Sequence, residues 1–134
     1  MPRTRRAYLL IATAVGEAAT GLFLLVSPAV PLWLLVGVEH PSPETALIAR
    51  VAGAALLAIG VGCWLGRVDQ PGPAQRGLIA GVLVYSTVVA VLLSYAGLSL
   101  GLVGIALWPA VGLHALLSVW CVTCLPAGQH RFSL

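Results

Sequence analysis

Four apolar runs, each about twenty residues long, constrain the fold of this chain more than any other feature. They cover approximately residues 7–27, 43–65, 77–98 and 102–125, and each is long enough to cross a hydrocarbon core of about 30 Å as a helix. Only 8% of the residues are charged, whereas a soluble domain carries about 25%. The sequence therefore predicts an all-α integral membrane protein, an up-down four-helix bundle that forms a single domain over residues 1–134.

The distribution of arginine predicts how the bundle is oriented. Six of the seven arginines flank the predicted helices on one side of the membrane if the chain crosses four times: Arg3, Arg5, Arg6, Arg67, Arg76 and Arg131. Arginine is enriched in cytoplasmic loops, so both termini are expected in the cytoplasm. The chain has neither lysine nor asparagine, which favours a GC-rich bacterial genome and hence a bacterial inner membrane.

The net charge of +3 follows from this asymmetry and requires no nucleic-acid partner. The lipid bilayer is the main expected partner. A second copy of the chain or another membrane protein is a further candidate.

A short apolar segment separates the first two predicted spans. Pro28 and Pro31 should end the first helix near Ser27, because proline removes a backbone donor and clashes with a continuing helix. The following residues, 32–38, are too few to cross the membrane, so an interfacial or re-entrant segment with Trp33 near the headgroups is expected. This segment either roofs a cavity or is an apolar linker that lies on the bundle.

The second predicted span has a recognisable start and a candidate packing face. Ser42 is expected as the N-cap with Pro43 as the first helical residue. Ala54, Ala58 and Gly62 are spaced four apart, and small residues at that spacing let membrane helices approach closely. We therefore expect these three residues to face a neighbouring helix.

The fourth predicted span contains Pro109. One interpretation is a helix that begins near Leu102 and is kinked at Pro109, and the other is a shorter helix that starts at Pro109 after an irregular segment.

Each predicted helix carries a polar residue near the middle of the membrane: Glu17, Arg50, Tyr85 and His114. At 1.5 Å per residue, Glu17 lies about 15 Å from either boundary, and Arg50 lies about 10 Å below the outer one. A charge at the bilayer centre costs about 2.5–3.5 kcal/mol, so such residues usually face the bundle interior and pair. We therefore expect Glu17 and Arg50 to form an ion pair.

This polar layer has two interpretations. One is an internal staple, by which we mean polar contacts that only hold the helices together. The other is a ligand-binding or proton-relay site, in which His114 would be suited to moving a proton near neutral pH. No nucleophile, cofactor loop or metal triad is recognisable, so enzyme and non-catalytic binder are not separated and no cofactor is predicted.

Cys63, Cys121 and Cys124 are expected near the cytoplasmic ends of their helices. Three thiols at one level are weak candidates for a metal or redox site, but cysteine is also a common buried residue. No metal is therefore predicted.

The segments "LLVSPAVPLWLLVG", "ARVAGAALLAIGVGCWLGR", "RGLIAGVLVYSTVVAVLLSYAGL" and "WPAVGLHALLSVW" resemble, in their order, small four-helix membrane proteins of the DoxX-like type. The resemblance rests on the general pattern of apolar residues together with Arg50, Tyr85 and His114, and it implies a four-helix bundle. Some members of that group are associated with quinone-linked redox chemistry. No catalytic motif matches, so no functional residue is carried over.

Glu17 in the first of four helices is also similar to the small multidrug resistance transporters, in which that carboxylate exchanges protons for cationic drugs. The expected neutralisation by Arg50 and the single predicted orientation argue against this interpretation. The leading hypothesis is a polar layer that binds a small lipophilic molecule. The alternatives are an accessory subunit of a membrane complex and a proton-coupled small-molecule transporter.

Overall fold

The structure is a computed structural model that describes residues 2–69 and 72–125. Within these residues all regular secondary structure is helical, in the order α1 (Pro2–Val26), α2 (Ala29–Val36), α3 (Pro43–Gly66), α4 (Pro73–Leu98) and α5 (Leu107–Cys124). The predicted all-α class is confirmed for the described residues, and four of these helices, all except α2, are long and apolar enough to cross a membrane. The up-down course and the orientation of the termini stay predictions, and Arg131, used for that orientation, lies outside the described residues.

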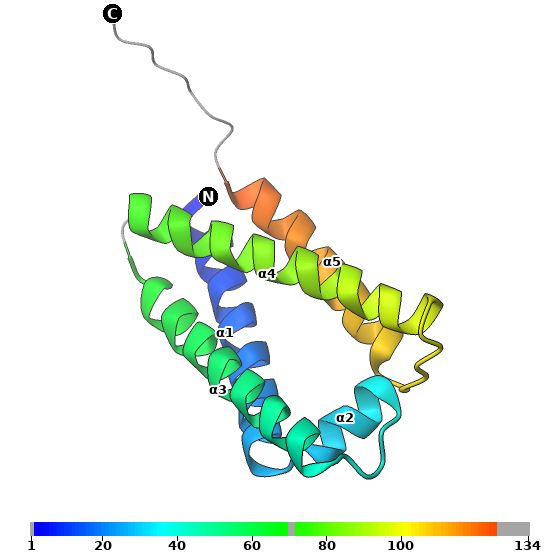
Figure 1. Cartoon of the computed structure of the whole chain (residues 1–134). Coiled ribbons are helices and arrows are strands. Elements are labelled where there is room, and N and C mark those ends of the chain that lie inside the picture. Colours follow the sequence, from blue (N-terminus) through cyan, green and yellow to red (C-terminus); the bar gives the residue numbers. More distant parts are fainter. Residues whose placement is uncertain (1, 70–71, 126–134) are drawn as a thin grey trace, which may run out of the picture.

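The four long helices form two pairs. α1 packs along α3 and α4 packs along α5, whereas contacts between the two pairs are few (Figure 1). The pairs approach each other at one end of the molecule, which we call the turn end. This end contains the start of α1, the turn between α3 and α4, and the end of α5. The pairs diverge toward α2, which we call the α2 end (Figure 1).

Glycines set the close contact between α1 and α3. A Cβ atom on Gly21 would lie 2.6 Å from the carbonyl oxygen of Gly53, and one on Gly53 would lie 2.7 Å from that of Gly21. Backbones that approach this closely are typical of helix association in lipid, where small residues line the interface. The predicted packing face of α3 was wrong for Ala54 and Ala58, which are exposed, whereas Gly62 is half-buried and faces Leu78 of the neighbouring helix α4.

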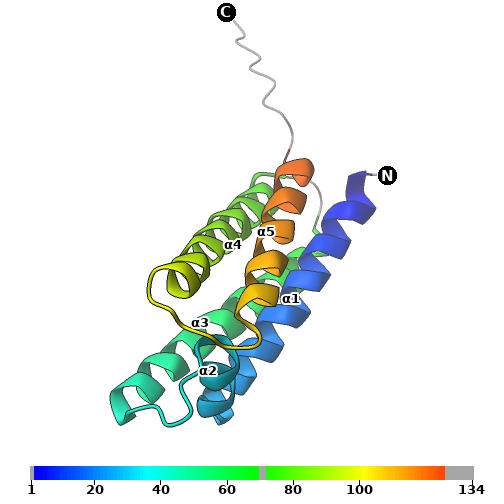
Figure 2. The same cartoon turned by 90° about the vertical axis from the view of Figure 1, so that its right-hand side faces the viewer.

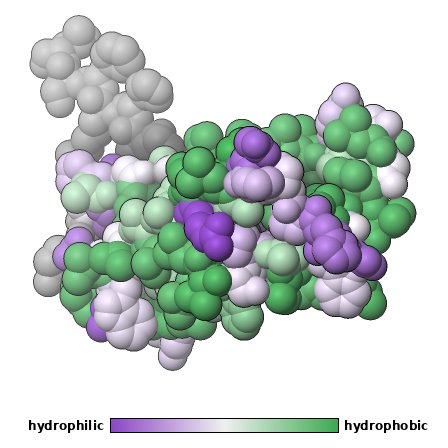
Figure 3. Space-filling model, turned by 60° about the horizontal axis from the view of Figure 1, so that its bottom comes forward, coloured by the Kyte–Doolittle hydropathy of each residue, from purple (hydrophilic) through white to green (hydrophobic). Residues whose placement is uncertain are grey.

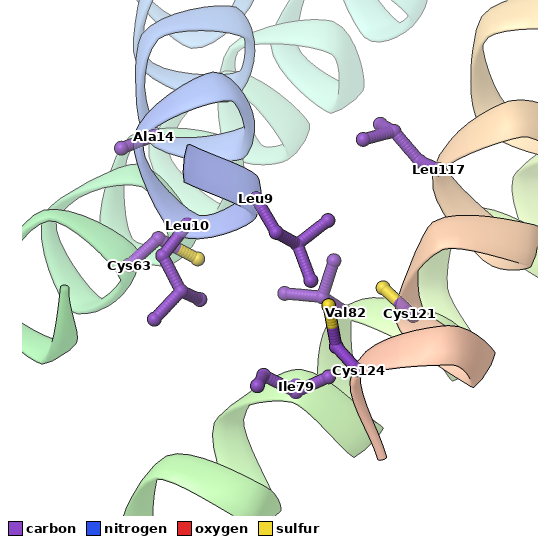
Figure 4. Close-up of a cluster of buried hydrophobic side chains, with 9 residues drawn as sticks. All are labelled: Leu9, Leu10, Ala14, Cys63, Ile79, Val82, Leu117, Cys121 and Cys124. Atoms are coloured by element: carbon purple, nitrogen blue, oxygen red, sulfur yellow. The ribbon is translucent and has the colours of Figure 1, made fainter. Parts of the chain in front are cut away.

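A compact apolar core closes the turn end. It contains residues from all four long helices: Leu9, Leu10, Ala14, Cys63, Ile79, Val82, Leu117, Cys121 and Cys124 (Figure 4). Arg6 Nε donates a hydrogen bond to the carbonyl oxygen of Cys124 across 3.1 Å. This places a cation at the last carbonyl groups of α5, where the helix dipole favours positive charge. The buried Gln75 side chain donates from Nε2 to the carbonyl oxygen of Gly66.

The α2 end is bridged by backbone contacts between α2 and the segment that precedes α5. The amide of Ala106 donates to the carbonyl oxygen of Leu34 across 2.8 Å, and Gly104 lies directly against the backbone of Leu34 and Leu35. Figure 2 shows α2 beside this connecting segment, between the diverging ends of α1 and α5. The apolar segment expected at 32–38 is therefore a short helix that begins at Ala29 and joins the two pairs.

Two predicted helix starts have clear outcomes. Ser42 caps α3 as predicted, because its Oγ accepts a hydrogen bond from the amide of Thr45 and Pro43 is the first helical residue. α5 begins at Leu107 rather than near 102, with Pro109 in its first turn. A proline is tolerated there because the amides of the first turn have no acceptor within the helix.

The surface that surrounds this frame is largely apolar. Figure 3 shows the α2 end brought forward, with a mostly hydrophobic surface that a few hydrophilic patches interrupt. Large exposed apolar side chains occur along all four long helices, as expected for helices whose outer faces contact lipid.

Candidate functional site

A cavity of about 420 Å³ lies between the two helix pairs toward the α2 end. Its lining residues come from all five helices and from the segment before α5: Ala19, Thr20, Phe23, Leu24, Val30, Pro31, Leu34, Leu35, Leu56, Tyr85, Val89, Leu93, Ala106, Ala110, Leu113 and His114. This volume lies within the range of about 300–1,000 Å³ that is typical of small-molecule sites. Of the two interpretations of the segment after helix α1, a roof over a cavity matches the structure, because α2 supplies four of the lining residues.

Glu17 lies next to this cavity, separated from it by Tyr85. The α1 helix positions its side chain in the interior, where it is only 6% exposed, and its Oε2 accepts a hydrogen bond from the Tyr85 hydroxyl across 3.0 Å. Glu17 itself does not line the cavity, whereas Tyr85 does. The carboxylate thus reaches the cavity through the hydroxyl of Tyr85, which links α1 to α4.

The His114 ring packs against Tyr85 and also lines the cavity. The two ring centroids are 5.6 Å apart and the ring planes meet at 81°, an edge-to-face arrangement that aromatic pairs prefer. Nδ1 of His114 is buried and has no hydrogen-bond partner among the described residues. A buried polar atom without a partner is energetically costly. Hydrogen bonds within the described residues therefore do not explain why the His114 ring is buried.

Two further hydroxyls, those of Ser118 and Thr87, lie next to His114. Ser118 Oγ donates to the carbonyl oxygen of His114 across 2.9 Å, and Thr87 Oγ1 donates to Ser118 Oγ across 3.2 Å. Ser118 lies one turn beyond His114 toward the turn end, whereas Thr87 lies two residues beyond Tyr85 toward the α2 end, and the bond between them connects α4 and α5. Three of the four predicted site residues, Glu17, Tyr85 and His114, are therefore brought together.

The predicted ion pair between Glu17 and Arg50 was wrong. The Arg50 side chain is exposed, and its Nε donates to the carbonyl oxygen of Leu25 at the end of α1, across 3.3 Å. Arg50 does not line the cavity. The physical reason is its position on α3: the neighbouring Ala49 and Gly53 pack in the interior, which turns the long side chain of Arg50 outward. It caps the last carbonyls of α1, where positive charge is favoured.

The three cysteines belong to the apolar core at the turn end. All three are free and buried, and Figure 4 shows Cys63 on one side of the core with Cys121 and Cys124 on the other. Among the described residues, no group of three or more histidine, cysteine or acidic side chains is arranged to hold a metal ion. The three cysteines are packed among the apolar side chains of this core.

Sequence reasoning missed most of the cavity wall. Thr20 follows Glu17 by one helical turn and lines the cavity, and the hydroxyl of Ser86 is buried without a partner among the described residues. A polar residue one turn from an intramembrane carboxylate is a usable signal for Thr20. The apolar lining residues carry no such signal, because they resemble residues that face lipid.

The helices and this cavity define a helical protein of the membrane-spanning type with a partly open cavity that has few polar groups in its wall. Comparison with known protein families, curated proteins and solved structures found no match. The resemblance to the DoxX-like group therefore stays a prediction.

Proposed function

We propose that this protein binds a small, largely apolar molecule in the cavity between its two helix pairs. The observation that carries the proposal is a partly open cavity of about 420 Å³ whose wall is apolar except for a few groups, among them Tyr85 and His114. Ligand sites in proteins are commonly of this kind, with a mainly hydrophobic wall and a few polar groups that orient the ligand.

The polar groups have distinct roles in this proposal. Tyr85 and His114 contact the ligand, and Glu17 fixes the Tyr85 hydroxyl by accepting its hydrogen bond. The open volume beside Tyr85 and His114 supports binding in addition to the structural bond between Glu17 and Tyr85.

The site belongs, in this proposal, to a bacterial inner-membrane protein with the turn end in the cytoplasm. The arginines near the start of α1 and around the turn between α3 and α4 support this orientation, and the acidic residues Glu39 and Glu44 lie toward the other side. Reporter fusions at the C-terminus and within residues 37–42 would test the orientation directly. A reporter at 37–42 that is active in the cytoplasm would contradict it.

Native mass spectrometry of the protein, extracted from its own membrane in a mild detergent, tests the function. The Ala110→Phe variant places a large side chain in the cavity wall, and Ala115→Phe makes the same change at an exposed position of the same helix that does not line the cavity. We expect a bound small molecule in the wild type and in Ala115→Phe, and its loss in Ala110→Phe.

Two results would contradict the proposal. One is a protein that carries no small molecule in any variant. The other is a protein that leaves the membrane with a stoichiometric protein partner and keeps that partner in Ala110→Phe, which would instead support the accessory-subunit hypothesis.

A further inference from the structure

The polar and apolar parts of the cavity wall lie at different depths. Along α4, the lining residues are Tyr85, Val89 and Leu93, in order from the middle of the helix toward the α2 end. Along α5, which runs in the opposite sense, Ala110 lies nearer the α2 end than His114. The two aromatic polar groups are therefore at the deep limit of the cavity.

The opposite limit is apolar. α2 contributes Val30, Pro31, Leu34 and Leu35, and the connecting segment contributes Ala106. The backbone groups in this roof are partly satisfied internally, since the Ala106 amide donates to Leu34. The roof thus offers a ligand hydrophobic contact and no charged side chain.

The deep limit accepts a hydrogen-bonding group but disfavours a charged one. Tyr85 already donates to Glu17, which leaves the oxygen of its hydroxyl as an acceptor, and the His114 ring makes no hydrogen bond within the described residues. A charge at mid-membrane is costly, so the deep limit disfavours an anionic or cationic group. A neutral hydroxyl avoids this penalty and can donate a hydrogen bond to the Tyr85 oxygen, which a carbonyl cannot do.

From these three observations we infer that the ligand is a neutral molecule with one polar end, bound with its hydroxyl deep in the membrane at Tyr85 and His114 and its apolar part against α2. This inference rests on the proposed function and names the ligand class and its direction. The apolar part spans from the level of Tyr85 to that of Leu93, eight residues of helix or about 12 Å.

This direction differs from that of a lipid adsorbed on the outside of the bundle. The polar group of such a lipid stays at the membrane surface, whereas the ligand inferred here places its polar group near the bilayer centre. The direction of a bound probe therefore separates a cavity ligand from surrounding lipid.

Two photoreactive analogues of 1-decanol test the inference, one with a diazirine beside the hydroxyl and one with a diazirine at the far end of the chain. The wild-type protein is reconstituted in phosphatidylcholine vesicles, and labelled residues are located by mass spectrometry. Only labelling that excess 1-decanol removes is counted, because labelling of lipid-facing surfaces is not saturable. We expect the first analogue to label residues next to Tyr85 and His114, and the second to label residues 30–35.

Competition by matched compounds tests the chemistry of the polar end. We expect decanoic acid to compete at least about tenfold more weakly than 1-decanol, because its carboxylate would have to enter the middle of the membrane. Equal competition by decanoic acid would overturn the neutral polar end.

The outcomes for direction and for function are separate. Reversed labelling, or the same residues labelled by both analogues, would overturn the inferred direction while the proposed binding stands. If neither analogue gives labelling that 1-decanol removes, or if Ala110→Phe and Ala115→Phe keep such labelling equally, the proposed function fails and the inference fails with it.

Discussion

The Tyr85 hydroxyl donates a hydrogen bond to Oε2 of Glu17 across 3.0 Å and so joins the two helix pairs in the membrane interior. Contacts between the pairs are otherwise concentrated at the turn end and at α2. The bond therefore connects the α1–α3 pair to the α4–α5 pair at the edge of the cavity.

Tyr85→Phe should destabilise the protein by about 1–3 kcal/mol, because it leaves a buried carboxylate oxygen of Glu17 without its donor. Tyr95→Phe is the matched control on the same helix, since the Tyr95 side chain is 55% exposed and the change should stay within about 0.5 kcal/mol. Unfolding in mixed detergent and SDS, followed by circular dichroism, measures both. Equal stability of the two variants would contradict the structural role of the bond.

Double-mutant cycles distinguish the observed partner of Glu17 from the predicted one. Combining Glu17→Leu with Tyr85→Phe should give a coupling energy of about 0.5–3 kcal/mol, as expected for residues in direct contact. Combining Glu17→Leu with Arg50→Leu should give less than about 0.5 kcal/mol, because Arg50 bonds Leu25 instead. The reverse order of the two coupling energies would restore the ion pair that the sequence predicts.

The sequence predicts depth in the membrane better than it predicts direction around a helix. Counting 1.5 Å per residue puts Glu17, Tyr85 and His114 at similar levels, and the structure brings these three together. The same count puts Arg50 within reach of Glu17 but does not say which way it points. In a soluble protein the apolar stripe of a helix would answer that question. Here the lipid and the interior are both apolar, so the stripe is missing.

The same ambiguity explains the wrong packing face on α3. That helix has small residues in two rows, and the row that includes Gly53 and Gly60 packs against α1, while Ala54 and Ala58 stay exposed. Spacing alone indicates that a close contact is present and does not select the row. Local chemistry was more informative at Ser42, where the cap depends on residues close in the sequence.

Alanine substitution of glycines tests the crossing of α1 and α3. A Cβ atom at residue 21 would lie 2.6 Å from the Gly53 oxygen and 2.8 Å from the Leu57 nitrogen, so Gly21→Ala should destabilise the protein by about 1–3 kcal/mol. Gly16, on the same helix, has no such neighbour within 4 Å, and Gly16→Ala should be neutral or stabilise by up to about 1 kcal/mol. The same unfolding assay measures both, and a Gly21→Ala variant as stable as Gly16→Ala would be inconsistent with this crossing.

The contact that holds α2 over the cavity gives the last prediction. The backbone of Leu34 and Leu35 lies so close to Gly104 that an added Cβ would overlap it, so Gly104→Ala should separate α2 from the segment before α5. The hydrogen bond from the Ala106 amide to Leu34 should then open more often. Hydrogen exchange in lipid nanodiscs, measured by mass spectrometry, should therefore become faster in peptides that cover residues 30–37 and 102–107, because local opening controls exchange.

Gly112→Ala is the control, since nothing lies within 4 Å of its added Cβ, and it should leave exchange in both peptides unchanged. If Gly104→Ala leaves exchange as slow as in Gly112→Ala, the roof is not held by this contact, and the cavity must be closed at the α2 end by other groups.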